Sequence, residues 1–341
     1  MNRPITTEVL PTHTPAQFLA AVRRAAELLR AGELVALPTE TVYGLAANAL
    51  NAQAVQRIFQ VKGRPFHNPL IVHVASVQMA GRCLATWPPL AEKLAAAFWP
   101  GPLTLVLPRA DHLPPALTAG GPTVGVRWPR HPFIQAVISE CGFPLAAPSA
   151  NPSTRLSPTN AQHVRKYWAG QIPLIVDGGQ SQVGIESTVL DLSVAPPRLL
   201  RPGMIAEHAL LAVTGELALG HGDSAAVLRS PGQLPKHYAP KAKLLLLSWK
   251  DEMHLNGQLA KAFGAQRPKV HVIAHTRIPS GQGFAAVSVI PRDPEAFARA
   301  IYAELHRCDE AGAEWIVVEA LPEAGEWRAI ADRLRRATTR D

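Results

Sequence analysis

The sequence has few cysteines and lacks the motifs that mark a structural metal site. Its three cysteines, Cys83, Cys141 and Cys308, lie far apart and form no CxxC pair. Separated thiols of this kind do not make a disulfide framework, so we expect reduced cysteines in an intracellular protein. An HExxH motif, paired CxxC motifs and an EF-hand loop are also absent from the sequence. The sequence therefore predicts no structural metal site.

Long apolar runs are missing as well. No stretch approaches the roughly 18 uninterrupted apolar residues that a membrane-spanning helix needs, so we expect no membrane span. The N-terminal residues place acidic, Thr and Pro residues ahead of any apolar run, which is not typical of a signal peptide. Together with the cysteine pattern, this predicts a cytoplasmic protein.

The common phosphate-binding and hydrolase motifs do not occur either. The chain has no GxxxxGK(S/T) loop, and the glycine-rich GGQSQVG at 178–184 does not fit GxGxxG. Ser149 is not part of a GxSxG elbow, and no histidine is tied to it by sequence, which argues against a catalytic triad. A nucleotide site, if present, must be built from other residues.

The composition is that of a folded protein with a basic surface. The 341 residues are 47% hydrophobic and 18% charged, which excludes a disordered chain and is long enough for two domains. The 32 prolines are scattered without a glycine period, which excludes collagen and suggests rigid turns. A net charge of +8 favours anionic partners such as nucleotides or nucleic acid. Because most mildly basic proteins bind no nucleic acid, this choice stays open.

Apolar periodicity predicts a mixture of helices and strands. Helical spacing predicts helices at 15–31, 52–60, 131–141 and 159–169. Short apolar or alternating runs predict strands at 70–74, 102–107, 123–128, 144–147, 172–176 and 187–192. Helices and strands mixed in this way indicate an α/β sheet that does not alternate strictly.

A change of composition divides the chain. Residues 214–241 are rich in Gly, Pro and Ser and predict a linker or an ordered lid. A second α/β pattern follows, with a long helix and a basic amphipathic terminal helix, and it suits one small domain. We therefore expect a catalytic domain at 1–213, a linker at 214–241 and a smaller α/β domain at 242–341.

Polar clusters follow several predicted strands. Thr41 lies in PTETVYG, directly after the first buried strand, where open α/β sheets bind ligands. Lys62 and Arg64 are two residues apart, and in an extended segment both cations would point to one side and suit a polyphosphate. A solvated surface pair remains an alternative for these two cations. His73 lies inside the strand LIVHV, and by itself a lone strand histidine is more often a half-buried residue with no functional role.

Further polar residues complete a possible anion site. Ser149 and Asn151 end a strand, where a hydroxyl and an amide can bind phosphate or carboxylate oxygens. Thr123 and Arg127 are four residues apart on an alternating strand and so share a face. Cations with surrounding hydroxyls and no interleaved aromatics suggest a pocket for a small anion rather than a nucleic-acid surface. The set also includes Ser187 and Arg201.

The motifs together resemble one enzyme family. The sequence is similar to threonylcarbamoyl-AMP synthases in their longer two-domain form, which has a YrdC-like catalytic domain. The resemblance covers roughly residues 15–240 in order and extends by length and pattern into the tail. Its matching strings are PTETVYGLAANA, KGRPFHNPLIVHV, FWPGPLTLVL, TVGVRWPRHP, PLAAPSANPS, SPTNAQHV, DGG, GIESTVLD, LLRPG and SPGQLPKHYAPK.

The resemblance implies a fold and a reaction. It implies a twisted mixed-sheet domain with a second, smaller Rossmann-like α/β domain. L-threonine, bicarbonate and ATP would give L-threonylcarbamoyl-AMP and pyrophosphate, with Mg²⁺ carried mainly by the ATP phosphates. Other proteins, the downstream tRNA threonylcarbamoyl-transfer machinery, would use the product to form N6-threonylcarbamoyladenosine. Weak binding of RNA or tRNA is a further expectation.

The resemblance also assigns roles to residues. It implies catalytic roles for Lys62, Arg64, Ser149 and Asn151. The nucleotide-binding positions that it implies are Arg64, Asn68, Thr123, Ser149, Ser157, Arg201 and Tyr238. The threonine-binding positions that it implies are Thr41, His73, Arg127, Ala147 through its backbone, and Ser187. Lys62 is expected to stabilise the phosphorus centre or the leaving pyrophosphate, and Lys62→Ala to lower turnover with little change in fold.

Two departures and two alternatives accompany this hypothesis. Gln233 and Leu234 replace a Met-Lys pair of the family's linker, and Thr154 replaces a glycine near the pocket. One alternative is an RNA-binding or ribosome-maturation factor without catalysis. The other is a carbamoyl-transfer enzyme for a different amine. The function of residues 242–341 cannot be predicted from the sequence, and the arginines of the last helix can equally form a solvated face.

Overall fold

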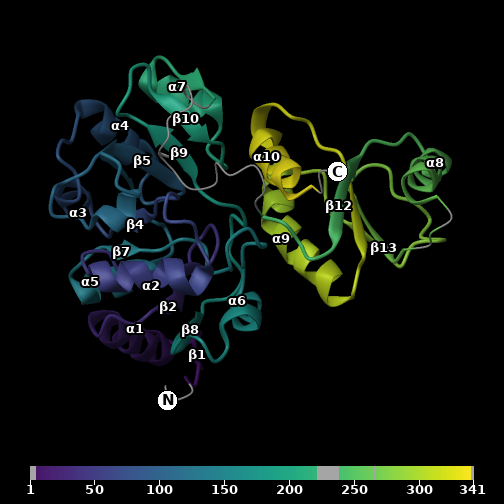
Figure 1. The fold of residues 1–341 in the computed structure, drawn as a ribbon. Coiled ribbons are helices and arrows are strands. Elements are labelled where there is room, and N and C mark those ends of the chain that lie inside the picture. Colours follow the sequence, from purple (N-terminus) through teal and green to yellow (C-terminus); the bar gives the residue numbers. More distant parts are fainter. Residues whose placement is uncertain (1–4, 221–237, 265, 267, 339–341) are drawn as a thin grey trace. The chain divides into compact units, whose positions relative to one another are not determined.

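The computed structural model describes residues 5–220, 238–264, 266 and 268–338. It divides the chain into two compact units. The first consists of Met1–Ser153 and Ser157–Leu234, and the second of Thr154–Leu156 and Pro235–Asp341. Each unit has its own sheet, as Figure 1 shows.

The first unit is built on one large mixed sheet. Some neighbouring strands in it are parallel and others are antiparallel. The described strands follow the spatial order β1 (Glu8–Pro11), β8 (Leu174–Asp177), β2 (Val35–Leu37), β3 (Gly44–Asn48), β7 (Leu145–Ala146), β4 (Ile71–His73), β6 (Thr123–Arg127), β5 (Leu103–Pro108), β9 (Thr188–Asp191), β10 (Arg198–Arg201) and β11 (Ala218–Leu219).

Helices cover this sheet, and the sequence determines where they begin and end. The helices are α1 (Pro15–Arg30), α2 (Ala52–Lys62), α3 (Val77–Arg82), α4 (Pro89–Phe98), α5 (Pro132–Cys141), α6 (Ala161–Trp168) and α7 (Glu207–Thr214), with the short 3-10 helix η1 (Pro115–Thr118). Asn51 caps α2 by accepting the N–H groups of Gln53 and Ala54. Gly63 ends that helix with a φ of 59°, a left-handed conformation that glycine adopts without strain.

The core of the first unit positions the polar residues at the strand ends. Apolar side chains of α1, α2 and α5 pack with the strands in one buried cluster, and the rings of Phe18 and Phe133 meet edge to face at 5.2 Å. The parallel register of β4 and β6 places His73 beside Arg127. The antiparallel pairing of β2 with β3 makes a tight loop of residues 38–43. Packing therefore brings several predicted site residues to the carboxyl ends of β2, β4 and β6.

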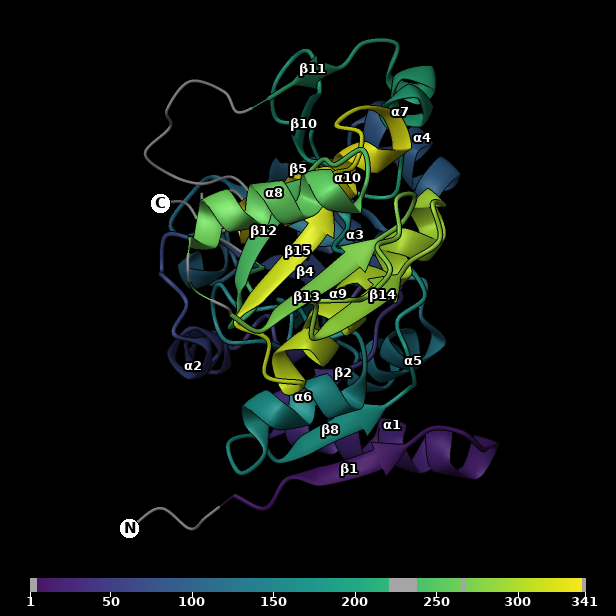
Figure 2. The ribbon, with the colours of Figure 1, turned by 90° about the vertical axis from the view of Figure 1, so that its right-hand side faces the viewer.

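The second unit is a smaller parallel α/β domain. Its strands are β12 (Lys243–Leu247), β15 (Trp315–Glu319), β13 (Val270–Ala274) and β14 (Ala286–Val289), in that spatial order and all parallel. Figure 2 shows α8 (Glu252–Phe263) on one face of this sheet, and α9 (Pro294–Glu310) and α10 (Arg328–Ala337) on the other. The predicted fold, a mixed-sheet domain with a smaller α/β domain, is confirmed.

The segment predicted as a linker, 214–241, lies mainly outside the described residues, and so do Gln233 and Leu234. Its first residues end α7 and form β11, which pairs with β10 in the first unit. Its last residues belong to the second unit, where the Ala239 N–H donates to the carbonyl of Thr154 at 2.9 Å. Thr154 has a φ of 70°, the conformation that a glycine would adopt more readily at this position.

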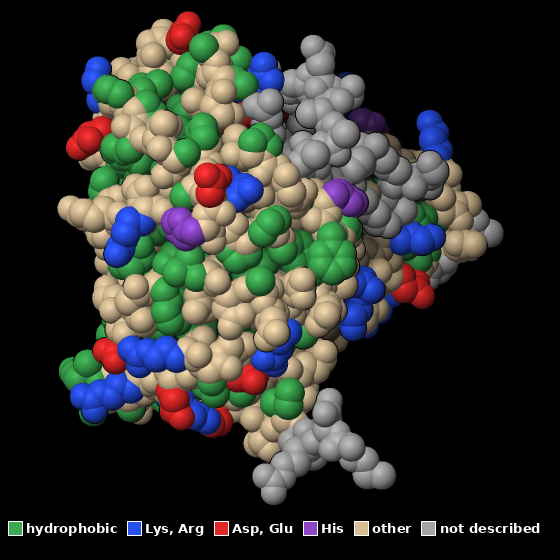
Figure 3. Space-filling view, turned by 60° about the vertical axis from the view of Figure 1, so that its left-hand side comes forward, with side chains coloured by type: hydrophobic (Ala, Val, Ile, Leu, Met, Phe, Trp, Pro, Cys, Tyr) green, Lys and Arg blue, Asp and Glu red, His purple; other side chains and the backbone are tan. Residues whose placement is uncertain are grey.

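The described surface is mixed in charge. On the face drawn in Figure 3, Lys and Arg side chains are scattered, and several of those low on the first unit lie beside Asp or Glu. Surface ion pairs such as Arg24 with Glu8, at 2.7 Å, account for this pairing. Among the helices of the described residues, none is long and apolar enough to cross a membrane.

Candidate functional site

The loop between β2 and β3 is a rigid turn held by its own hydroxyls. Thr39 Oγ1 accepts the N–H groups of Thr41 and Val42 at 3.2 and 3.3 Å and donates to the Val42 carbonyl at 2.6 Å. Tyr43 donates its hydroxyl to the Gly179 carbonyl at 2.7 Å. Hydroxyl-to-backbone bonds of this kind fix a short polar loop without secondary structure. The loop thus holds Thr41 in a defined position.

Arg127 is the cation at the centre of this loop. Its Nη1 donates to Thr41 Oγ1 at 2.9 Å, and its Nε donates to the Gly101 carbonyl at 3.2 Å. Its Nη2 lies 2.7 Å from Glu40 Oε1, and each of these two side chains is only 5% exposed. Burial by itself would raise the pKa of Glu40, but the Arg127 guanidinium and backbone N–H donors together outweigh burial and hold that pKa below its ordinary value. The carboxylate is therefore ionised and orients Arg127.

His73 ends β4 beside Arg127. It is buried, and burial first and the Arg127 charge second lower the pKa of His73 to about 3. The imidazole is therefore neutral near pH 7. Its Nδ1 has no hydrogen-bond partner among the described residues. A buried polar atom of this kind needs a partner, and a bound substrate is one that suits it.

Lys62 joins the end of α2 to the loop after β7. Its buried Nζ donates to the carbonyl of Ser149 at 2.5 Å and to the carbonyl of Asn151. Burial first and the charge of Arg64 second lower the pKa of Lys62 well below its ordinary value. The two carbonyl acceptors and an arriving anion favour the charged ammonium, which has one more N–H than these two bonds use. Lys62 can thus fix this loop and still donate to an anion.

The side chains of Arg64 and Lys62 bind different loops. Its Nε donates to the Asn68 carbonyl at 3.0 Å, and its Nη2 donates to Asn68 Oδ1 at 2.7 Å and to the Pro69 carbonyl at 2.8 Å. The extended segment assumed for residues 62–64 is wrong, because Lys62 is helical and Gly63 turns the chain in a left-handed conformation. The two cations organise two different loops, 149–151 and 68–69.

Ser187 and Arg201 form a second buried pair at the start of β9 and the end of β10. Arg201 donates from Nε to the Ser187 carbonyl and from Nη2 to Ser187 Oγ, both at 3.0 Å. Ser187 Oγ also lies 2.8 Å from Thr104 Oγ1 of β5. Gly203 permits this junction, since a Cβ there would lie 2.3 Å from the Thr188 nitrogen. The RPG motif therefore acts through close packing as well as through its arginine.

The remaining predicted residues occupy less central positions. Ser157 donates to Glu186 Oε1 at 2.5 Å and is buried. Thr123 begins β6 and Arg127 ends it. A rise of about 3.3 Å per residue places the two roughly 13 Å apart, so they lie at opposite ends of the strand. The N–H of Ala147 already donates to the Ile71 carbonyl at 3.3 Å, which leaves its carbonyl for a substrate.

Tyr238 is described as part of the second unit. Its backbone φ is 61°. Its ring is buried, and the ring centroid lies 6.0 Å from that of Tyr302. The Arg333 guanidinium lies over the same ring at 5.2 Å, a cation–π arrangement.

Backbone bonds draw the separate loops of the first unit together. The N–H of Val183 donates to the Glu40 carbonyl at 2.7 Å, and that of Gly184 donates to the Thr41 carbonyl at 3.0 Å. Ser153 donates its N–H to the Lys62 carbonyl at 2.8 Å. Ser149 forms an isolated bridge with Gly44 at the end of the first loop. Loops 39–43, 149–153 and 183–187 are therefore neighbours.

Sequence reasoning missed three buried polar residues of this arrangement. Glu40 was part of the PTETVYG motif but received no role, although an acid inside a mostly apolar and hydroxyl-rich stretch is a signal for a buried ion pair. Thr104 interrupts the apolar strand LTLVL and binds Ser187. Glu186 accepts from Ser157. Their partners are distant in the chain, so spacing alone could not identify them.

The described residues contain no group of three or more His, Cys, Asp or Glu side chains that could hold a metal ion. The acids of the site are engaged already, Glu40 by Arg127 and Glu186 by Ser157. The arrangement is instead suited to organic anions, because buried guanidinium and hydroxyl donors bind carboxylate and phosphate oxygens.

Comparison with known proteins identifies related sequences over both units. Residues 27–203 match a family model described as Telomere recombination, and residues 200–339 match one described as Threonylcarbamoyl-AMP synthase, C-terminal domain. The chain is 41% identical to the threonylcarbamoyl-AMP synthase of Pyrococcus abyssi, over 93% of this chain and 94% of the relative. It is 40% identical to that of Bacillus subtilis, over 97% and 95%.

Solved structures agree with the sequences. The crystal structure of P. abyssi Sua5 complexed with L-threonine matches with a TM-score of 0.88 and 38% identity, over 97% of each chain. Escherichia coli YciO, at 22% identity and a TM-score of 0.52, covers 58% of this chain and 96% of its own, and it shows the fold alone. The sequence-based prediction is confirmed: this chain belongs to the threonylcarbamoyl-AMP synthase family.

Proposed function

We propose that this chain joins L-threonine, bicarbonate and ATP to give L-threonylcarbamoyl-AMP and pyrophosphate, and so acts as a nucleotidyltransferase. Family membership across both units favours this catalytic function over an RNA-binding factor without catalysis. The structural observation that carries the proposal is the buried Arg127, tied to Thr41 beside the neutral His73. A buried cation next to neutral polar groups suits a zwitterionic amino acid.

We assign the threonine side of the reaction to the loop around Arg127. Arg127 has N–H groups beyond those bound to Glu40, Thr41 and Gly101, and these can bind the threonine carboxylate while Glu40 keeps the guanidinium in place. His73 Nδ1 and the Ala147 carbonyl supply polar partners without adding a charge. Ser187 completes this side, and the threonine complex of the P. abyssi relative supports a threonine pocket in this fold.

We assign the nucleotide side to the loops that Lys62 and Arg64 organise. Lys62 binds the carbonyls of Ser149 and Asn151 and so fixes the loop that carries the Ser149 hydroxyl. An arriving phosphate would then meet donors that are already in place. Arg64 with Asn68, and Arg201 with Ser187, add further oriented guanidinium and amide groups. Asn151, Ser157, Thr123 and Tyr238 are the remaining proposed contacts.

The reaction can proceed in two balanced steps. The threonine ammonium first releases a proton to water, its free amine attacks the carbon of bicarbonate, and loss of water leaves an N-carboxylate. One oxygen of that carbamate then attacks the α-phosphorus of ATP, and the bond to pyrophosphate breaks with its electron pair on the leaving oxygen. Arg127 and Lys62 act by positioning two anions close together and balancing their charge. With its lowered pKa, His73 serves as a neutral hydrogen-bonding group rather than as a base.

Mg²⁺ is proposed to enter with ATP, bound by the phosphates and water. The described acids near the site are committed to Arg127 and Ser157, so they do not fit a protein-built metal site, and we assign no step to the ion. We further propose that the reaction takes place in the cytoplasm. There the product would pass to a tRNA threonylcarbamoyl-transferase, and weak contact with tRNA would help that transfer.

The product tests this proposal directly. The full chain is incubated with ATP, Mg²⁺, threonine and ¹³C-bicarbonate, and mass spectrometry seeks an adenylate that contains one threonine and one ¹³C atom. Arg127→Gln should abolish this product. Arg57→Gln, a surface arginine 2.7 Å from Glu33, is the matched control and should keep it. An adenylate without ¹³C, or none at all, would refute the proposal.

A further inference from the structure

The second unit has a pocket at the carboxyl ends of its parallel strands. The pocket has a volume of about 290 Å³, and it is lined by Glu319 at the end of β15 and by residues that follow β12, β13, β14 and β15. β15 and β13 are neighbours in the sheet. From β13 the chain continues outward to β14, whereas from β15 it continues to α10, which packs against β12 on the opposite side of β15. Neighbouring parallel strands whose connections leave in opposite directions create a crevice in which α/β proteins bind ligands.

Glu319, the last residue of β15, fastens the floor of this pocket. Its side chain is 3% exposed and accepts the N–H groups of His275, Thr276 and Arg277 at 2.8, 2.9 and 3.2 Å. Burial alone would raise the pKa of Glu319, but these three backbone donors hold it below its ordinary value. The carboxylate is thus ionised, and the N–H dipoles of the loop that it binds partly offset its charge towards an anion in the pocket.

His275 forms a fixed wall of the pocket. Its Nε2 lies 3.3 Å from the Ala320 carbonyl and its Nδ1 lies 2.8 Å from Thr276 Oγ1, so both ring nitrogens have partners. The ring stacks on Trp327, at 6.3 Å between centroids, and meets the edge of Phe297. These contacts hold the ring in one orientation and make it a fixed part of the pocket wall.

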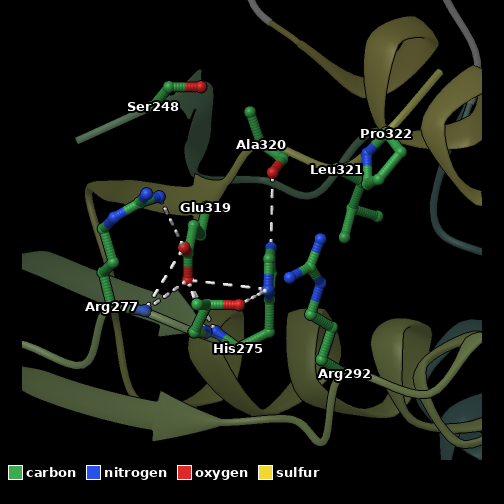
Figure 4. A pocket seen from close by; sticks show the side chains of 9 residues that line it. Ser248, His275, Arg277, Arg292, Glu319, Ala320, Leu321 and Pro322 are labelled. Atoms are coloured by element: carbon green, nitrogen blue, oxygen red, sulfur yellow. Dashed lines mark hydrogen bonds and ion pairs between the residues drawn. The ribbon is translucent and has the colours of Figure 1, made fainter. Parts of the chain in front are cut away.

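Two arginines face the pocket with donors to spare. Arg277 Nη1 is 3.9 Å from Glu319 Oε1, too long for a hydrogen bond, and half of the Arg277 side chain is exposed. Arg292 has no hydrogen bond or ion pair to the part of the chain that the structure describes. Figure 4 shows these two guanidinium groups on either side of His275, with Ser248, Leu321 and Pro322 around the space above.

We propose that this pocket binds a small organic anion through Arg277 and Arg292, with a phosphate or a carboxylate as the recognised group. Two guanidinium groups offer the forked donors that both groups accept, and the Ser248 and Thr276 hydroxyls add neutral donors. Leu321 and Pro322 suit a short apolar part of the ligand. The volume is at the lower end of the roughly 300–1,000 Å³ of small-molecule sites, which limits the ligand to a few carbon atoms.

This binding site does not depend on the synthase reaction, and it gives the second unit a function of its own. Its test uses the ¹⁵N-labelled full chain, titrated with inorganic phosphate or with succinate against chloride at equal ionic strength. The amide signals of Thr276 and Arg277 report on this pocket alone, because these N–H groups bind Glu319 in its floor. We expect them to shift with saturation by phosphate, by succinate or by both, and the tighter probe identifies the recognised group.

Variants make the test specific. Arg292→Gln and Arg277→Gln should each weaken binding about tenfold, the effect of one lost charge-assisted hydrogen bond. Arg335→Gln is the matched control, because Arg335 also lies 3.9 Å from a glutamate, Glu323, and its side chain is 52% exposed against 51% for Arg277. It should leave binding unchanged. Shifts that do not saturate, that chloride reproduces, or that saturate at the same ligand concentration in Arg292→Gln as in the native chain would overturn the proposal.

Discussion

Arg127 Nη2 lies 2.7 Å from Glu40 Oε1 with both side chains 5% exposed, whereas the same distance joins Arg57 to Glu33 at side-chain exposures of 38% and 34%. The two pairs have the same chemistry and differ in burial. Removing one partner of a buried pair leaves an uncompensated charge, while a surface pair is replaced by water. The chain therefore contains its own control for the role of Glu40.

Glu40→Gln should destabilise the first unit far more than Glu33→Gln. We expect the free energy of unfolding to fall by about 3 kcal/mol for Glu40→Gln, because Arg127 stays buried without its counter-charge. For Glu33→Gln we expect a loss below about 1 kcal/mol. Urea denaturation followed by tryptophan fluorescence measures both. Equal losses in the two variants would mean that Glu40 and Arg127 do not form a buried pair.

His73 should make the folded protein sensitive to mild acid. Its pKa is about 3 in the folded chain against 6.5 as the ordinary value, so between these pH values the unfolded chain binds a proton that the folded chain does not. Stability contributed by the neutral ring is therefore complete above pH 6.5 and is lost as the pH falls towards 3. The slope from this residue is at most about 1.4 kcal/mol per pH unit.

His73→Gln removes that proton and should flatten the pH dependence over the same window. Unfolding free energies of the two proteins, measured from pH 7 to pH 4, make the comparison. An imidazole nitrogen NMR titration of the native protein is the independent check, and the ring should stay neutral at pH 5. A ring that titrates near its ordinary pKa of 6.5 would contradict the burial described for His73.

Lys62→Met should lower the turnover number about 100-fold, the effect of removing one preorganised donor from a transition state. The structure adds a stability cost to the sequence-based expectation, because Lys62 also holds the Ser149 and Asn151 carbonyls. Losing these bonds should reduce the unfolding free energy by about 1–3 kcal/mol. Single-turnover kinetics measure the first effect, and urea denaturation measures the second. Lys93→Met, on the exposed face of α4, is the control and should change neither quantity.

Gly203→Ala should disturb the junction of β9 and β10. The added Cβ would lie 2.3 Å from the Thr188 nitrogen and 2.6 Å from its Oγ1, so the backbone next to Ser187 and Arg201 must move. We expect ATP to bind at least tenfold more weakly and the unfolding free energy to fall by about 2 kcal/mol or more. Gly81→Ala has open space at its Cβ in helix α3 and should be neutral or slightly stabilising. Normal ATP affinity in Gly203→Ala would exclude this junction from the nucleotide site.

The sequence predicts strands best where apolar residues run together. The expected strands at 70–74 and 102–107 correspond to β4 and β5, since buried β-branched and Leu residues dominate both. Strand β3 was not predicted, because GLAAN has low strand propensity and becomes a strand only by pairing with β2 and β7. Tertiary pairing outweighs local preference there.

The same distinction applies to the sites. Family motifs name Arg127, Lys62 and Arg201, but they give no role to Glu40 or Thr104. Glu40 pairs with Arg127 and Thr104 binds Ser187, and only folding brings these distant residues together. The pocket of the second unit gave no sequence signal, because Glu319 binds backbone N–H groups and no side-chain motif records that. Backbone donors at strand ends are visible only in three dimensions.

The release of pyrophosphate tests the central claim most directly. The purified full chain, ATP and Mg²⁺ are combined with both co-substrates, and then with threonine or bicarbonate omitted in turn. We predict release only when both are present, because the carbamate that attacks the α-phosphorus needs the nitrogen of one and the carbon of the other. Equal release in the absence of either co-substrate would identify a nucleotide hydrolase and contradict the assignment of Arg127, Thr41 and His73 to threonine.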